Sequence, residues 1–151
     1  MTHGTCIGPL TPTYLLDYDR QYSLFTPGQV SLASLLGGPL AGFWLLAVNF
    51  RRRAEAAAAV FSLMGGVVVS ALLLAIVCSA VGQVPAKYSL LALAATAYAM
   101  CLVADSLQGA EVKFHKRAGG ETASAWTACA AGLIVAAAQL PVLLTVVALA
   151  G

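Results

Sequence analysis

Charge is what this sequence has least of. Only 9% of its 151 residues are Asp, Glu, Lys or Arg, while 60% are hydrophobic. A soluble domain has roughly a quarter of its residues charged, because its surface faces water. The few charges here cannot cover such a surface, and they cluster between long apolar runs. The sequence therefore predicts an integral membrane protein.

What is missing also excludes several classes of function. The net charge is only +2 and the basic residues are scattered, which does not favour nucleic-acid binding. The four cysteines contain no Cys-x-x-Cys pair, so we expect small buried hydrophobic residues, with a disulfide through Cys6 as the alternative. No nucleophile with a base and no cluster of metal ligands can be assembled. We therefore expect a protein that is not an enzyme and that uses no metal and no cofactor.

Four apolar runs are each long enough to cross a bilayer, which takes roughly 20 residues. The first 28 residues lack the basic and apolar regions of a signal peptide, so residues 1–28 are expected to be an external tail. With short connectors, residues 29–151 should form an all-α four-helix transmembrane bundle in up-down-up-down order. The predicted transmembrane helices cover residues 29–49, 56–82, 88–107 and 123–150.

Basic residues determine the expected orientation. The second connector has only Lys87 and the tail has only Arg20. Lys and Arg are enriched on the cytoplasmic side of membrane proteins. We therefore expect a multi-pass protein of the bacterial inner membrane, with the first and third connectors in the cytoplasm and both termini in the periplasm. Those two connectors carry the other six basic residues: Arg51, Arg52, Arg53, Lys113, Lys116 and Arg117.

Two short sequence patterns lie just before or at the start of the first apolar run. Thr-Pro-Gly-Gln at residues 26–29 has the spacing of a capping box, with proline at the first helical position, and predicts a helix start. Tyr14, Tyr18 and Tyr22 recur every four residues, so on a helix they would form one stripe. Tyrosine favours the membrane–water interface. The stripe predicts an interfacial turn or short helix, or else an outer surface that binds a partner.

Small residues recur at helical spacing in the apolar runs. Helices in lipid associate through close packing, which favours such residues. These faces predict either contacts inside the bundle or a surface for a partner or a second copy of the chain. Pro39 lies within the first run and has no backbone N–H to donate, so we predict a kink there. The small residues are Ser34, Gly38 and Gly42 in the first run, and Ser62, Gly66 and Ser70 in the second.

Polar residues near or within the runs are few. Asp105 is expected to form an ion pair at the membrane surface, with the arginine cluster or with Lys113, the alternative being a proton-relay site. Gln139 lies two residues before Pro141 and could cover a backbone carbonyl that lacks its helical partner. His115, in the third connector, is expected to be solvated. These groups are too few for an aqueous path or an ion filter.

The stretch from residue 22 to residue 52 has a distinct pattern. An aromatic-Ser pair at residues 22–23 is followed by Pro-x-Gln at 27–29, Gly-x-Pro-Leu-Ala-Gly at 37–42 and Asn-aromatic-Arg at 49–51. This pattern resembles the first span of small four-span bacterial inner-membrane proteins of unassigned function. It covers about a fifth of the chain and implies no activity. Some small multi-span proteins of this sort look like immunity proteins, which protect a bacterium from a membrane-active toxin.

Three functions are consistent with these features. The first is non-catalytic binding in or at the bilayer, most concretely as an immunity protein that neutralises a membrane- or periplasm-acting bacterial toxin. The second is an accessory or assembly subunit of a larger membrane complex. The third is a small transporter or channel, although the first run lacks the carboxylate that four-span exporters carry. The expected partners are the lipid bilayer and a protein, either a toxin or a complex subunit, with a homo-oligomer as a further option.

Overall fold

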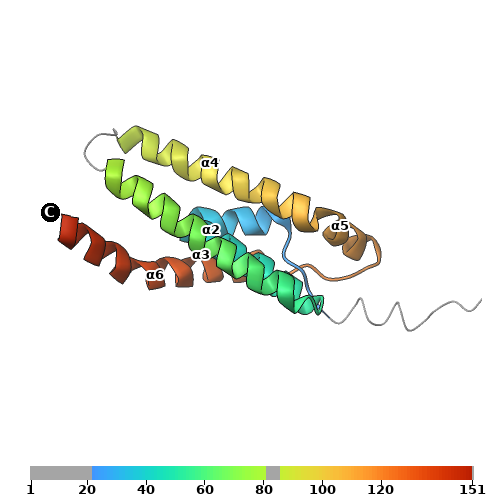
Figure 1. Ribbon diagram of the computed structural model, residues 1–151. Coiled ribbons are helices and arrows are strands. Elements are labelled where there is room, and N and C mark those ends of the chain that lie inside the picture. Colours follow the sequence, from blue (N-terminus) through green and yellow to red (C-terminus); the bar gives the residue numbers. More distant parts are fainter. Residues whose placement is uncertain (1–21, 81–85, 151) are drawn as a thin grey trace, which may run out of the picture.

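The computed structural model describes residues 22–80 and 86–150, most of which are helical (Figure 1). The elements are α2 (Pro27–Arg52), α3 (Ala56–Ala80), α4 (Ala86–Ala104), a π-helical turn η1 (Asp105–Gly109), α5 (Ala110–Arg117) and α6 (Ala125–Ala150). Within these residues, four stretches are long and apolar enough to cross a membrane: Pro27–Arg52, Ala56–Val77, Leu90–Arg117 and Ala125–Thr145. The predicted all-helical fold with four such helices is confirmed.

The start of α2 confirms the predicted capping box. Thr26 Oγ1 accepts from the backbone N–H of Gln29 at 3.4 Å, and Gln29 Oε1 accepts from the N–H of Thr26 at 2.9 Å. Pro27 takes the first helical position, where a backbone N–H has no helical partner. Gln29 Nε2 also donates to the carbonyl of Ala123, so the cap ties α2 to the residues just before α6.

The third apolar helix is longer than predicted. The sequence placed its end at residue 107, but α4, η1 and α5 follow one another without a break to Arg117. Residues 110–117 are mostly good helix formers, and α5 buries Val112 while its charged side chains stay exposed. The helix ends in a Schellman motif: Gly119 has φ +82°, and the N–H of Gly120 donates to the carbonyl of His115 at 2.9 Å.

Helix α2 folds back on itself. The backbone N–H of Phe25 donates to Asn49 Oδ1, and Asn49 Nδ2 donates to the Phe25 carbonyl, each at 2.9 Å. In a straight helix these two residues would lie about 36 Å apart, at 1.5 Å per residue. The backbone leaves helical geometry at Gly37 and Gly38, and the chain reverses there. Pro27–Arg52 is therefore a helical hairpin.

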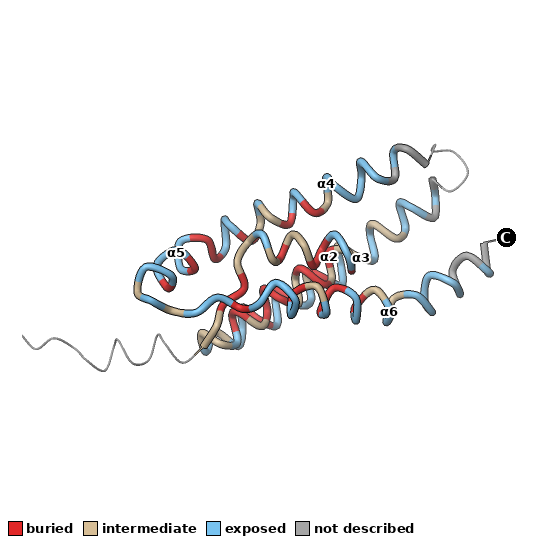
Figure 2. The backbone as a smooth tube through the Cα atoms, turned by 180° about the vertical axis from the view of Figure 1, so that it is seen from behind, coloured by how far each residue is buried: buried red, intermediate tan, exposed pale blue. Residues whose placement is uncertain are grey.

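The hairpin is the core of the protein. Its first arm (residues 27–36) and second arm (residues 39–52) are about 15 and 21 Å long, whereas α3 is about 38 Å long. The helices α3, α4 and α6 each pack against the hairpin; among the described residues α4 contacts neither α3 nor α6. Of the most apolar 18-residue stretch of the hairpin, 56% of the residues are buried. In the equivalent stretches of the other three apolar helices, 17% or fewer are buried. Figure 2 shows the buried residues concentrated along α2 and toward α5.

Both ends of the hairpin lie at one end of the bundle, here called the latch end (residues 22–26, 49–55 and 105–124). The last turns of α3 and α6 and the first turn of α4 lie at the opposite end (Figure 1). The sequence predicted that the residues before the first helix lie across the membrane from the arginine connector. The structure instead places Ser23 against Arg52, whose side chain donates to the Ser23 carbonyl. Residues 29–49 were predicted to run from one end of the bundle to the other. In the structure they start and end at the latch end.

Candidate binding site at the hairpin tip

Three residues build the turn of the hairpin. Gly37 ends the first arm with φ −117° and ψ 15°. Gly38 has φ 70° and ψ −176°, a region that glycine adopts almost alone. Pro39 opens the second arm with its φ already suited to a helix start. A kink was predicted at Pro39; the departure from helical geometry lies instead at Gly37 and Gly38, and it reverses the chain.

Glycines allow the arms and the outer helices to approach closely. A Cβ atom added at Gly42 would lie 2.1 Å from Ser34 Oγ on the opposite arm. One added at Gly66 of α3 would lie 2.7 Å from a side chain of the second arm, Phe43. A Cβ at Gly37 would lie 2.3 Å from the carbonyl oxygen of Gly132 in α6. Such close approach is how helices in lipid gain contact.

The predicted small-residue faces divide into two groups. Four of the small residues lie at contacts inside the bundle. For example, Ser62 Oγ donates to the Phe43 carbonyl at 3.0 Å. Two others, Gly38 and Ser70, border a cavity instead. The internal group consists of Ser34, Gly42, Ser62 and Gly66.

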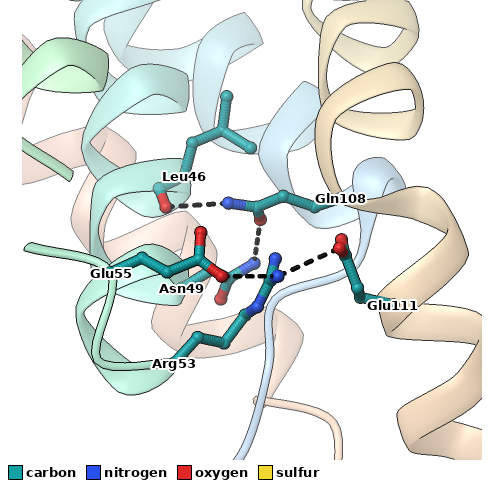
Figure 3. Close-up of polar contacts among 6 residues, drawn as sticks. All are labelled: Leu46, Asn49, Arg53, Glu55, Gln108 and Glu111. Atoms are coloured by element: carbon teal, nitrogen blue, oxygen red, sulfur yellow. Dashed lines mark hydrogen bonds and ion pairs between the residues drawn. The ribbon is translucent and has the colours of Figure 1, made fainter. Parts of the chain in front are cut away.

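Two buried amides hold the open ends of the hairpin together (Figure 3). Asn49, only 1% exposed, bonds both backbone polar groups of Phe25 and also donates to Gln108 Oε1 at 2.8 Å. Gln108, in η1, donates to the Leu46 carbonyl at 3.1 Å. Asn49 thereby uses its acceptor and both of its donors. The pair fixes both arms and the third helix in one arrangement, which we call the amide latch (Asn49 and Gln108).

Arg53 joins the α2–α3 connector to α5. It forms ion pairs with Glu55 at 2.7 Å and with Glu111 at 2.9 Å (Figure 3). Both carboxylates are more than 40% exposed, and such pairs contribute little to stability. Arg53 also places its guanidinium over the Phe50 ring, 5.9 Å from the ring centre. Its role is therefore to position the connector at the latch end.

The segment before the hairpin is held at the latch end by two further contacts. Arg52 donates to the carbonyl and the hydroxyl of Ser23. The backbone of Leu24 pairs with the chain before α6: its N–H donates to the Glu121 carbonyl at 3.2 Å, and its carbonyl accepts from Ala123 at 2.9 Å. These bonds place the start of the described chain beside the third connector.

His115 is buried, which corrects the expectation of a solvated connector. It is 3% exposed, and its Nε2 lies 3.2 Å from the Glu121 carbonyl. The ring of Tyr22 stacks on it with centres 5.1 Å apart. Gly120 leaves room for the ring, since a Cβ atom there would lie 2.3 Å from Nε2. Tyr22 therefore packs on the third connector, at the latch end of the bundle.

The remaining predicted residues divide between surface positions and undescribed ones. Asp105 pairs with Lys113 at 3.2 Å, and both side chains are more than half exposed. This confirms one of the two predicted pairings. Among the described residues no group of three His, Cys, Asp or Glu side chains could hold a metal, and Cys101 and Cys129 are free thiols. Four residues named above lie outside the described part: Cys6, Tyr14, Tyr18 and Arg20.

A cavity of about 790 Å³ lies at the hairpin tip, between the turn and the helices α3 and α6. Its described wall is almost entirely apolar and contains no ionisable residue. The side chains in the wall that carry a polar atom are Trp44, Ser70 and Gln139. A cavity of this size, with a few polar groups in an apolar wall, is typical of a small-molecule site.

Two polar side chains of the cavity wall, Ser70 and Gln139, are incompletely paired. Ser70 Oγ is shielded from solvent and has no hydrogen-bond partner in the described chain. Gln139 Nε2 makes a long bond of 3.5 Å to the Gly37 carbonyl, which the turn leaves without a helical partner. Gln139 was predicted to cover the carbonyl that Pro141 leaves free in its own helix, but the bond that it makes is to the Gly37 carbonyl of α2.

The burial of three polar residues was not predicted from the sequence: Asn49, Gln108 and His115. For Asn49 a signal existed, because a lone amide at the end of an apolar run needs a partner once it is buried. For Gln108 the sequence contained no such signal, since the π-helical turn changes which residues share a helix face. His115 sits among charged residues, and that composition is typical of a solvated loop.

No protein-family model, curated protein or solved structure matches this chain. The geometry and chemistry of the chain itself therefore carry the functional argument.

Proposed function

We propose that this is a non-catalytic binding protein of the bacterial inner membrane, and that its binding site is the hairpin-tip cavity. The observation that carries the proposal is an apolar cavity placed against a helix break. Catalysis needs a nucleophile with a base or a group that stabilises developing charge. The described wall offers one hydroxyl, on Ser70, and one side-chain amide, on Gln139. Such a wall suits reversible binding.

We further propose that the hairpin is re-entrant, entering and leaving the membrane from the latch end. The three crossing helices would then be α3, α6 and the continuous helix α4–η1–α5. Non-helical backbone at membrane depth is tolerated only where protein covers it or where it lines a cavity. Both conditions support this arrangement, because three helices surround the hairpin and its turn borders the cavity.

The orientation follows from basic residues at the two ends of the bundle. The latch end carries six of them, whereas the first turn of α4, at the other end, carries only Lys87. By the positive-inside rule the latch end is cytoplasmic. Residues 22–26 then lie in the cytoplasm and the end of α6 in the periplasm, instead of both on the periplasmic side as expected. The six are Arg51, Arg52, Arg53, Lys113, Lys116 and Arg117.

Cysteine labelling tests this arrangement. Single cysteines replace Gly28, Lys116 and Ala148, all exposed, in an otherwise cysteine-free chain. An impermeant maleimide applied to intact spheroplasts should label only the Ala148→Cys variant, and it should label the other two once the membrane is opened. Gly28→Cys decides the question, because a straight first span would place it in the periplasm. Labelling of that variant in intact spheroplasts would contradict the re-entrant hairpin.

The most concrete cellular role remains immunity against a membrane- or periplasm-acting toxin, bound at the same cavity. Cells that produce the protein should survive a toxin encoded beside its gene. The Ala138→Phe variant, which places a large side chain in the cavity wall, should lose this protection and no longer copurify with the toxin. Ala137→Phe is the matched control, since Ala137 is equally exposed but lies outside the wall.

Survival is the measurement, with membrane protein level checked by immunoblot. Absence of rescue against every neighbouring toxin would eliminate the immunity role. Cavity-dependent copurification of a membrane complex would then identify the protein as an accessory subunit. Equal behaviour of the Ala137→Phe and Ala138→Phe variants in both assays would overturn the cavity as the binding site.

A further inference from the structure

Three cations at the latch end form no ion pair with the described residues. Arg53 and Lys113 are ion-paired at this end. Arg52 donates to the carbonyl and the hydroxyl of Ser23. The contact of Arg53 with Glu111 places the end of α2 beside α5, so the cations of both elements lie at the same end of the bundle. The three unpaired cations are all exposed, and we call them the basic rim: Arg51, Lys116 and Arg117.

The latch end as a whole has a surplus of positive charge. Its segments contain six basic and four acidic residues, which leaves a surplus of two. Three of the four carboxylates are in ion pairs with Arg53 or Lys113, and the fourth belongs to Glu121. An anion is therefore attracted to this end of the protein and meets cations there that have no carboxylate partner.

Two large aromatic side chains at the same end are exposed. Phe114 of α5 is 66% exposed, and Trp126 in the first turn of α6 is 83% exposed. Helix α5 buries Val112 and His115 against the protein, so Phe114 lies on its outer side, between the basic residues of the same helix. Exposed aromatic residues next to Lys and Arg are typical of a helix at the membrane–water interface.

The length of the third helix places α5 at the same depth. From Ala86 to Arg117 the helix is about 48 Å long, at 1.5 Å per residue. The hydrocarbon core of a bilayer is about 30 Å thick, and the whole bilayer with its headgroups is about 40–45 Å thick. In the proposed arrangement the first turn of α4 lies at the periplasmic surface. The eight residues of α5 then lie among the headgroups of the cytoplasmic leaflet.

From these observations we propose that the basic rim and Phe114 form a binding surface for anionic phospholipids of the cytoplasmic leaflet. Phosphate oxygens accept hydrogen bonds from the rim, and the Phe114 ring lies against the upper part of the acyl chains. The exposed ring favours a lipid over a free phosphate or an acidic protein, because only the lipid brings an apolar chain with its anionic group. The proposal rests on the proposed membrane arrangement, and it does not involve the hairpin-tip cavity.

Quenching of a single tryptophan by brominated lipids provides the test. The reporter is the Phe114→Trp variant, with Trp44→Phe and Trp126→Phe removing the other two tryptophans, and circular dichroism checks that it is folded. The full-length protein is reconstituted in phosphatidylcholine vesicles that contain a minor fraction of one brominated lipid. This lipid is either phosphatidylglycerol, which is anionic, or phosphatidylcholine, which has no net charge, at the same mole fraction. Bromine quenches a tryptophan that it contacts.

Brominated phosphatidylglycerol should quench the reporter more strongly, by an amount that corresponds to about fivefold enrichment. A basic residue near an anionic surface contributes about 1 kcal/mol, which is roughly fivefold in affinity. Replacing the three cations of the basic rim with glutamine should make the two lipids quench equally. Lys87→Gln is the matched control, because it removes the same charge at the opposite end of the bundle, and it should keep the preference. High salt should reduce the preference.

Four results would overturn the proposal: equal quenching by the two lipids with the basic rim intact, a preference that survives its replacement, loss of the preference in Lys87→Gln, or quenching by neither lipid. Its failure is distinguishable from that of the proposed function. If the lipid preference is absent while Ala138→Phe abolishes protection, the lipid surface is wrong and the binding function stands. If the labelling experiment contradicts the re-entrant hairpin while the rim-dependent preference is present, the arrangement is wrong and the lipid surface stands.

Discussion

Replacing Asn49 with leucine should lower the free energy of unfolding by about 3 kcal/mol, because three hydrogen bonds are lost and their partners stay buried. Two of these bonds join Asn49 to the backbone of Phe25, and the third joins it to Gln108. A buried polar group left unpaired costs roughly 1 kcal/mol or more. The lost hydrogen bonds are those that join the two open ends of the hairpin, where no turn connects the arms. The hairpin should therefore open at the latch end.

Unfolding in mixed micelles of increasing denaturing-detergent content measures this loss, with circular dichroism as the signal. Thr145→Val is the control, because Thr145 is exposed and bonds only the Pro141 carbonyl within its own helix. That change should alter stability by less than about 0.5 kcal/mol, as surface substitutions usually do. If both variants unfold at the same detergent content, Asn49 does not hold the hairpin closed.

A double-mutant cycle separates the amide latch from its surroundings. Gln108→Leu alone leaves Asn49 Nδ2 and the Leu46 carbonyl short of a partner. Each single variant leaves the remaining amide without the partner that was removed. In the variant that carries both leucines neither amide is present, so this penalty disappears. The combined loss should therefore be smaller than the sum of the single losses, by about 1 kcal/mol. Additive losses would mean that the two amides act independently.

The three outer helices were predictable because each depends only on local properties of the sequence. A stretch of twenty or more apolar residues predicts a helix that can span a membrane, whatever it packs against. The predicted helix over residues 56–82 corresponds to α3, and that over 123–150 corresponds to α6. Residues 88–107 lie within α4 and η1, and the extension to Arg117 was missed because charged residues in a membrane protein indicate a connector.

The hairpin could not be predicted in the same way. Hydropathy carries no information about the direction in which the chain runs. The two short arms together contain about as many residues as one transmembrane helix, so their hydropathy is the same as that of a single span. Gly37, Gly38 and Pro39 are compatible with a kink as well as with a reversal, since both need a helix end followed by a helix start. What distinguishes them is the contact between Phe25 and Asn49, and such a contact between distant residues leaves no local signal.

The hairpin accounts for the pattern at residues 22–52 residue by residue. Tyr22 and Ser23 bind at the latch end, and Pro27 and Gln29 start the first arm. The Gly-x-Pro-Leu-Ala-Gly segment at residues 37–42 builds the turn and the crossing of the arms, and Asn49 joins the open ends. The pattern therefore describes one structural unit, a closed helical hairpin, and not a series of separate sites.

Three glycine-to-alanine variants of α2 should differ sharply in stability, although each adds only one methyl group. At Gly37 the backbone is acceptable for alanine, but the new Cβ would lie 2.3 Å from the Gly132 carbonyl oxygen. A backbone atom cannot move aside as a flexible side chain can, so α6 must shift away from the hairpin tip. We expect Gly37→Ala to cost about 3 kcal/mol, at the upper end of the range for overpacking, and to weaken binding at the cavity.

The other two variants isolate the remaining effects. A Cβ at Gly38 meets no atom closer than 3.9 Å, but φ 70° with ψ −176° is a region that glycine adopts almost alone, so Gly38→Ala should cost about 1–3 kcal/mol through the backbone alone. A Cβ at Gly28 meets nothing within 4 Å, and Gly28→Ala should be neutral or stabilising by up to about 1 kcal/mol. The detergent titration used for Asn49 gives all three values. A straight first helix predicts no such difference, since alanine is favoured over glycine at every interior helix position. Gly37→Ala and Gly38→Ala would then be as stable as Gly28→Ala, which would contradict the hairpin.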